Sequence, residues 1–193
     1  MFVLPDNLPI ELAPLAFLVG KWSGTGVIAF DGEEHEFTQT VEFAPDGSVL
    51  NYISSAKLMS GTETPLPSEL GYWRVRRPRF EFDAGPGLLP GRGETDITSH
   101  ESMDRFRAEH GGFDLEVSTI HPGGFAELYK GWVRQGRIEL ASEAGVAFEG
   151  AKVYRHSTRM YGLVEGALLW AWDIALPGQD LKSHASARLE RVG

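Results

Sequence analysis

Hydrophobic and polar residues alternate along most of the chain, and turn-forming residues interrupt the alternation at short intervals. In one such stretch, Phe37, Val41 and Phe43 alternate with polar residues before a Pro-Asp-Gly turn at 45–47. A period of two is typical of a β-strand that buries one face. The same pattern predicts further strands at 21–30, 49–58, 70–76, 80–83, 113–120, 125–132, 137–142, 151–164, 167–174 and 181–192.

Short turns such as Gln-Gly at 135–136, Glu-Gly at 165–166 and Pro-Gly at 177–178 join most of these segments. Strands joined by hairpins form an antiparallel meander. Such a sheet usually closes on itself, because closure removes its exposed edges. We therefore predict an all-β fold, a single antiparallel barrel of roughly ten strands.

One short helix is predicted before the first strand. Asn7 can cap its first turn, Pro9 suits an early position, and Gly20 ends it, while Pro14 limits its length. Its apolar side chains fall on one face: Leu8, Leu12, Leu15, Ala16 and Val19. We expect this helix to close one end of the barrel.

Residues 84–112 break the regular spacing. Four glycines and two prolines fall within the first ten of these residues, and a polar stretch follows. A connection this long is uncommon in a compact domain. We interpret it as an insertion between two strands, with a helical turn around 102–108, in a chain that forms one domain over 1–193.

Composition narrows the class of protein. The chain has no cysteine, which excludes disulfides, thiolate metal sites and a cysteine nucleophile. A net charge of −9 argues against binding to duplex nucleic acid. The longest purely apolar run, at 167–172, is too short to span a membrane, and residues 1–9 lack the basic start of a signal peptide. We expect a cytoplasmic protein.

The segment 20–26, Gly-Lys-Trp-Ser-Gly-Thr-Gly, carries the most information. Trp22 offers a large apolar side chain to the end of the barrel. Gly24 and Gly26 face the same side of the strand, where their missing side chains leave room for a flat ligand or a neighbouring backbone. The alternative is a bulged, sharply coiled first strand without a ligand.

This segment resembles the nitrobindins, haem-binding barrels related to the lipocalins and fatty-acid-binding proteins. Three further segments are similar to that family: Glu-Leu-Gly-Tyr-Trp-Arg at 69–74, His-Pro-Gly-Gly-Phe-Ala-Glu at 121–127, and the closing strand at 181–191. The four motifs occur in the family's order. The chain departs from the family at 29–32, where relatives continue the first strand into Tyr-Pro-Thr.

The resemblance implies a calycin-like barrel that binds haem b, with His184 as the metal ligand and catalytic residue. It implies a cavity lined near Gly24 and Gly26 and by Trp172 or Trp170, mostly apolar and without a general base. Ferric iron held there could bind nitric oxide and isomerise peroxynitrite to nitrate. The alternative is a non-enzymatic carrier of a fatty acid or another small hydrophobic molecule, without haem. The partners are then small molecules, and a homodimer is left open.

His184 has two interpretations. Strict alternation places it with Lys182, Ser186 and Arg188, on the face that the simple rule turns outward. The resemblance turns it inward, as an iron ligand. The family pattern also pairs Arg188 with Trp22 as a structural cation–π contact. We expect surface or turn positions for the remaining histidines: His35, His100, His110, His121 and His156.

Overall fold

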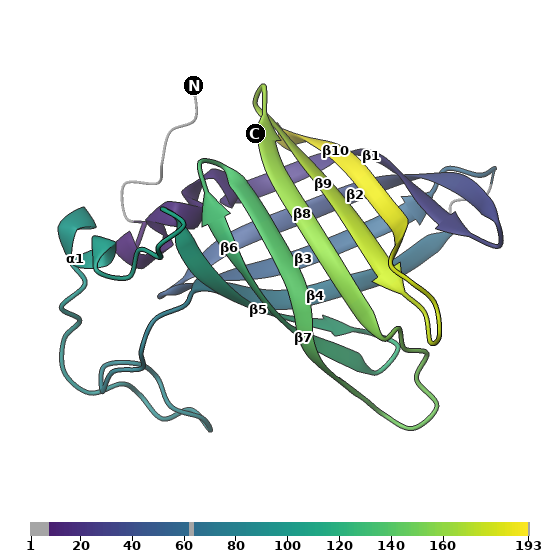
Figure 1. Ribbon diagram of the computed structural model, residues 1–193. Helices are drawn as coiled ribbons and strands as arrows, with labels where there is room; N and C mark the ends of the chain where they lie inside the picture. The colour runs from purple at the N-terminus through teal and green to yellow at the C-terminus, as the bar shows by residue number, and fades with distance from the viewer. Residues whose placement is uncertain (1–7, 62–63, 193) are drawn as a thin grey trace.

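A closed barrel of ten antiparallel strands makes up the computed structural model, which describes residues 8–61 and 64–192 (Figure 1). Each strand pairs with its neighbours in sequence, and β1 pairs with β10 to close the sheet. The predicted meander and its closure are confirmed. The strands are β1 (Gly20–Phe30), β2 (Glu33–Asp46), β3 (Val49–Leu58), β4 (Pro65–Val75), β5 (Phe113–His121), β6 (Phe125–Arg134), β7 (Arg137–Ala147), β8 (His156–Val164), β9 (Ala167–Ala175) and β10 (Lys182–Val192).

The predicted N-terminal helix is a 3-10 helix, η1 (Ile10–Leu18), which lies at one end of the barrel (Figure 1). Pro14 lies inside it and has no N–H to donate, which disfavours a regular α-helix. Leu12, Leu15 and Leu18 are fully buried and belong to the barrel core. The helix thus closes this end, as expected. The predicted cap, Asn7, lies outside the described residues.

Trp22 is fully buried beside η1, and its indole N–H donates a hydrogen bond to the Leu18 carbonyl at 2.7 Å. The guanidinium over its ring belongs to Arg191, 4.1 Å from the ring centre. The prediction that Arg188 makes this contact is wrong. Trp22 lies opposite Arg191 in the β1–β10 ladder. Arg188 alternates with inward residues of β10, so it points outward and pairs with Glu190.

The predicted strand at 80–83 is also wrong, because this segment forms a turn. Phe80 and Phe82 stack with ring centres 5.0 Å apart, and the Arg77 guanidinium lies over both rings. The phenylalanines thus pack on a cation and on each other rather than on a strand neighbour. Their alternation resembles a strand only because two aromatic rings of one turn share a face.

The long connection folds onto the η1 end of the barrel (Figure 1). It contains a short helix, α1 (His100–Asp104), which begins two residues before the predicted helical turn and is capped by Ser99. Ile97 and Met103 are buried in the barrel core. The insertion is therefore partly a structural element. Within the described part of the chain, no helix is long and apolar enough to cross a membrane.

Candidate functional site

A cavity of about 460 Å³ lies inside the barrel, in the size range of small-molecule sites. Residues of several strands and of the 148–155 loop form its wall. The predicted strand at 151–164 begins only at His156, which leaves that loop free to line the cavity. Aromatic and aliphatic side chains cover much of the wall: Ile28, Phe37, Phe125, Tyr154, Trp170 and Trp172.

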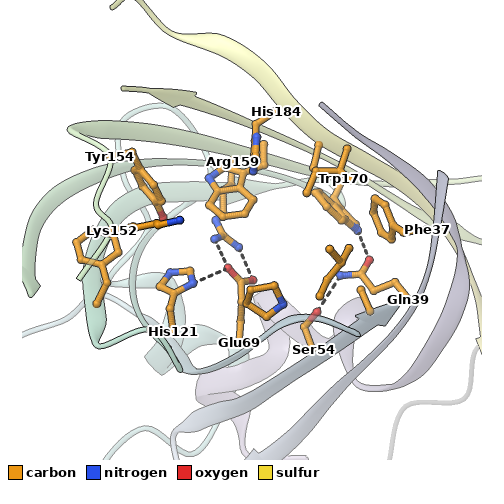
Figure 2. A pocket seen from close by; sticks show the side chains of 18 of the residues that line it. Phe37, Gln39, Ser54, Glu69, His121, Lys152, Tyr154, Arg159, Trp170 and His184 are labelled. Carbon is orange, nitrogen blue, oxygen red and sulfur yellow. Dashed lines mark hydrogen bonds and ion pairs between the residues drawn. The ribbon is translucent and has the colours of Figure 1, made fainter. Parts of the chain in front are cut away.

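His184 lies on this wall because β10 contains a bulge (Figure 2). Ala185, Ala187 and Leu189 follow the alternation and point inward, as the pattern predicts. The pairing with β9 shifts between Ser183 and Ala185, so His184 is the extra residue. A bulge re-aims a side chain that strict alternation would turn outward. His184 therefore faces the cavity next to inward-pointing Ala185.

The His184 imidazole is suited to bind a metal. Burial lowers its pKa, and this effect is opposed by a hydrogen bond from the ring to the backbone of Ala29. The ring is therefore neutral at neutral pH, and a neutral imidazole keeps one nitrogen lone pair that a metal can bind. Its ring packs against the ring of Trp172, with centres 5.2 Å apart and planes at 81°.

Five polar side chains form a closed ring, of which Glu69, His121 and Arg159 line the cavity. Arg159 binds Glu69 with both terminal nitrogens, at 2.8 and 2.5 Å, and its Nε donates to the Tyr129 hydroxyl at 3.1 Å. Tyr129 donates to Glu127 at 2.8 Å. His121 lies 3.3 Å from Glu127 and 3.5 Å from Glu69, which completes the ring. Figure 2 shows the contacts of Glu69 with Arg159 and His121.

Both carboxylates of this ring are held ionised. Burial disfavours the charged form of Glu69, but the adjacent Arg159 guanidinium outweighs this and lowers the pKa to about 2. Burial likewise opposes ionisation of Glu127, yet hydrogen bonds from His121, Tyr154 and Tyr129 lower its pKa. The two carboxylates are therefore weak bases whose acceptor positions are occupied.

A second polar chain lies on the opposite part of the wall (Figure 2). The Trp170 indole donates to the Gln39 side-chain oxygen at 2.8 Å, and the Gln39 amide donates to the Ser54 hydroxyl at 2.8 Å. Gln39 and Ser54 are buried. These bonds satisfy the polar groups of this part of the wall within the protein, so its rings present an apolar surface to the cavity.

Of the residues that the sequence singled out, Trp170, Trp172 and His184 lie on the cavity wall, whereas Gly24 and Gly26 do not. A Cβ at Gly24 would lie 2.1 Å from the Arg188 carbonyl oxygen, and one at Gly26 would lie 2.3 Å from that of Ser186. The space beside both glycines is filled by β10. Of the two occupants considered for this space, the contacts fit a neighbouring backbone and not a flat ligand. The alternative of a bulged first strand is wrong, because β1 pairs with both neighbours without a register shift.

Sequence reasoning missed most of the polar ring. His121 begins the 121–124 turn, as expected, because its carbonyl accepts from the Gly124 N–H. The alternative of a surface position is wrong, because only 14% of its side chain is exposed and it faces the cavity. The expectation of a mostly apolar cavity overlooked this ring. Glu69, His121 and Glu127 lie inside the two motifs at 69–74 and 121–127, so the motifs pointed to them. No signal in the sequence pointed to Arg159.

Comparison with known proteins identifies relatives along nearly the whole chain. Residues 11–191 match the family described as "THAP4-like, heme-binding beta-barrel domain". A peroxynitrite isomerase of Leifsonia xyli subsp. xyli (strain CTCB07) is 50% identical over 197 residues and is covered completely, as is this chain. A peroxynitrite isomerase of Clavibacter michiganensis subsp. michiganensis (strain NCPPB 382) is 47% identical over 199 residues, also with complete coverage of both.

The fold is also shared with a solved structure, the crystal structure of Rv2717c from M. tuberculosis. The TM-score is 0.69, and the match covers 97% of this chain and 100% of that chain. The sequences are 23% identical, so this likeness concerns the fold alone.

Proposed function

The chain belongs to the family of THAP4-like, heme-binding β-barrel domains, and from this premise we propose that it is a peroxynitrite isomerase with haem b on His184. The observation that carries the proposal is the β10 bulge, which turns a neutral imidazole into the cavity. The family and the haem agree with the resemblance found in the sequence. The assignment of His184 is our own proposal.

The cavity residues fit a haem. A neutral histidine with one free ring nitrogen is a common axial ligand of haem iron. Phe37, Trp170 and Trp172 offer flat aromatic surfaces to a macrocycle. Lys152 belongs to the loop that lines the cavity and is exposed, so its ammonium could meet a haem carboxylate.

When bound, the haem iron supplies the chemistry that rearranges peroxynitrite into nitrate. Peroxynitrite and nitrate contain the same atoms and carry the same charge, so the protein need not take up or release a proton. Glu69 and Glu127 fit this requirement, because their low pKa values and occupied acceptors prevent them from acting as bases. The protein thus holds the cofactor, orients it and limits water around it.

The carrier hypothesis receives less support. A fatty-acid carboxylate inside a barrel needs a cation with free donors. Arg159, the guanidinium on the cavity wall, already donates to Glu69 and Tyr129, and Lys152 is exposed on the loop rather than buried inside the barrel. We therefore prefer haem as the ligand and keep nitric oxide as its predicted small-molecule partner. A homodimer and a cytoplasmic location also stay predictions.

Reconstitution with haemin tests the proposal. The loaded wild type should show a sharp Soret band, speed peroxynitrite decay in stopped flow and direct the product towards nitrate. His184→Ala should bind haemin more weakly and lose most of this activity. His156→Ala is the matched control, because His156 is hydrogen-bonded to Ser142 and does not line the cavity.

The proposal is wrong if wild type and His184→Ala bind haemin equally and give the nitrate-to-nitrite ratio of free haemin. In that case the carrier hypothesis takes its place. A fluorescent fatty acid displaced by unlabelled oleate would then test it directly.

A further inference from the structure

We propose that Arg159 is a positioning residue, which holds the Trp172 ring against His184 and so fixes the orientation of the imidazole. The inference rests on the proposed role of His184 as iron ligand. Arg159 does not contact His184 through a hydrogen bond; its effect passes through the indole. Three sets of contacts support it.

The guanidinium of Arg159 is fixed in one plane. Only 4% of its side chain is exposed. Glu69 holds both of its terminal nitrogens, and Tyr129 accepts from its Nε. A fork held at three nitrogens has little freedom to rotate. Arg159 therefore presents a flat, immobile face to whatever packs on it.

Trp172 packs on that face. The central carbon of the guanidinium lies 4.0 Å from the centre of the Trp172 ring. The buried indole N–H of Trp172 has no hydrogen-bond partner in the described part of the chain. No hydrogen bond of its own therefore sets the tilt of this ring, and its orientation depends on stacking contacts, of which Arg159 supplies the charged one.

His184 depends on Trp172 in turn. As the extra residue of a bulge, His184 lies outside the regular β9–β10 ladder, and such residues have a less constrained backbone. Its ring is held by the Ala29 backbone and by the edge-on contact with Trp172. A series of contacts thus runs from Glu69, in the motif at 69–74, through Arg159 and Trp172 to His184 in the closing strand.

The plane of Arg159 matters in this arrangement, in addition to its charge. Lysine carries the same charge but has neither the flat face nor the three-point fork. The Arg159→Lys variant should therefore lose the contact between the Trp172 and His184 rings. This separates positioning from a general electrostatic effect of a buried cation.

The first test uses the protein without haem. Nuclear Overhauser contacts between the ring protons of Trp172 and His184 should be present in wild type. They should be lost in Arg159→Lys and in the double variant Glu69→Gln/Arg159→Gln, which avoids leaving a buried carboxylate unpaired. Arg77→Gln is the matched control, since Arg77 is equally buried and pairs with Glu11 and Asp83 away from the cavity.

The second test uses haemin. Loss of a group that orients a metal ligand typically weakens metal binding by about 10- to 100-fold, so both Arg159 variants should release haemin at least about tenfold faster than wild type. Arg77→Gln should release it at the wild-type rate. The inference is overturned if the ring contacts and the haemin release rate of the double variant match those of wild type. It is also overturned if both quantities in Arg159→Lys match those of wild type.

The two tests separate this inference from the proposed function. If wild type binds no haemin, the proposed function fails, while the ring contacts of the haem-free protein still decide the role of Arg159. If haemin binds through His184 and the ring contacts survive in both variants, only the positioning role is wrong.

Discussion

Two tryptophans of the barrel are held in opposite ways. Trp22 is fully buried at the η1 end, where the Leu18 carbonyl accepts its N–H and Arg191 covers its ring. Trp172 lies on the cavity wall and has no acceptor for its N–H in the described chain. The first therefore contributes packing and a satisfied hydrogen bond to stability, whereas the second is placed by its neighbours for the site.

Trp22→Ala should destabilise the fold by about 3–5 kcal/mol, the usual range for removing a large buried aromatic side chain. The loss combines a cavity beside η1 with an unpaired Leu18 carbonyl. Thermal and urea unfolding measure it. Trp132→Ala is the control, because Trp132 lies on the outer face of β6 and should cost much less. A melting curve equal to that of wild type would contradict the burial of Trp22.

Glu69 predicts a pH dependence of stability. Its pKa in the folded protein is about 2, below the ordinary 4.5, so its ion pair stabilises the fold fully above pH 4.5. This contribution falls as the pH falls from 4.5 towards 2. Urea midpoints measured between pH 6 and 2 should therefore decline less steeply in Glu69→Gln than in wild type. Parallel curves for the two proteins would show that the carboxylate is not held ionised by Arg159.

At the scale of elements, β10 and the segment 84–112 show why the period of hydrophobic residues alone does not predict which side chains face the interior. Alternation correctly placed Ala185, Ala187 and Leu189 inside, but a one-residue bulge moved His184 to their side. A bulge depends on the register between β10 and its neighbour β9, which the alternation within β10 does not reveal. In 84–112, only Ile97 and Met103 are deeply buried apolar residues, and they lie too far apart to form a period.

The segment should therefore divide into two parts in a deletion experiment. Residues 86–93 are exposed, so removing them and closing the gap should change the free energy of unfolding by less than about 1 kcal/mol. Met103→Ala should cost about 2–5 kcal/mol, because Met103 is buried in the core. Denaturant unfolding compares the two. Equal changes in the free energy of unfolding for the deletion and for Met103→Ala would contradict this division of the segment.

At the scale of the whole molecule, hairpin spacing was enough to predict a ten-stranded closed barrel, because consecutive antiparallel strands leave few other topologies. The site was predicted less completely. His184 and Trp172 came from a motif and from alternation, whereas Arg159 became visible only when β8 was placed across the barrel from Glu69 on β4. The interior ion pair of Arg159 with Glu69 joins residues 90 positions apart, a separation that sequence patterns do not encode.

The net charge of −9 also acts on the molecule as a whole. It should repel anionic peroxynitrite, and added salt screens repulsion over about 10 Å at 0.1 M ionic strength. For the haemin-loaded protein, the second-order rate constant of peroxynitrite decay should thus rise modestly as salt increases from about 20 to about 200 mM at fixed pH. Nitric oxide is neutral, so its association rate serves as the internal control and should not change.

A peroxynitrite rate that falls with salt would mean that local positive charge governs the encounter instead. Lys152 on the cavity wall and Arg155 in the same loop would supply this charge. Lys152→Gln would then remove that fall, since charge steers an encounter most strongly where it lies at the entrance.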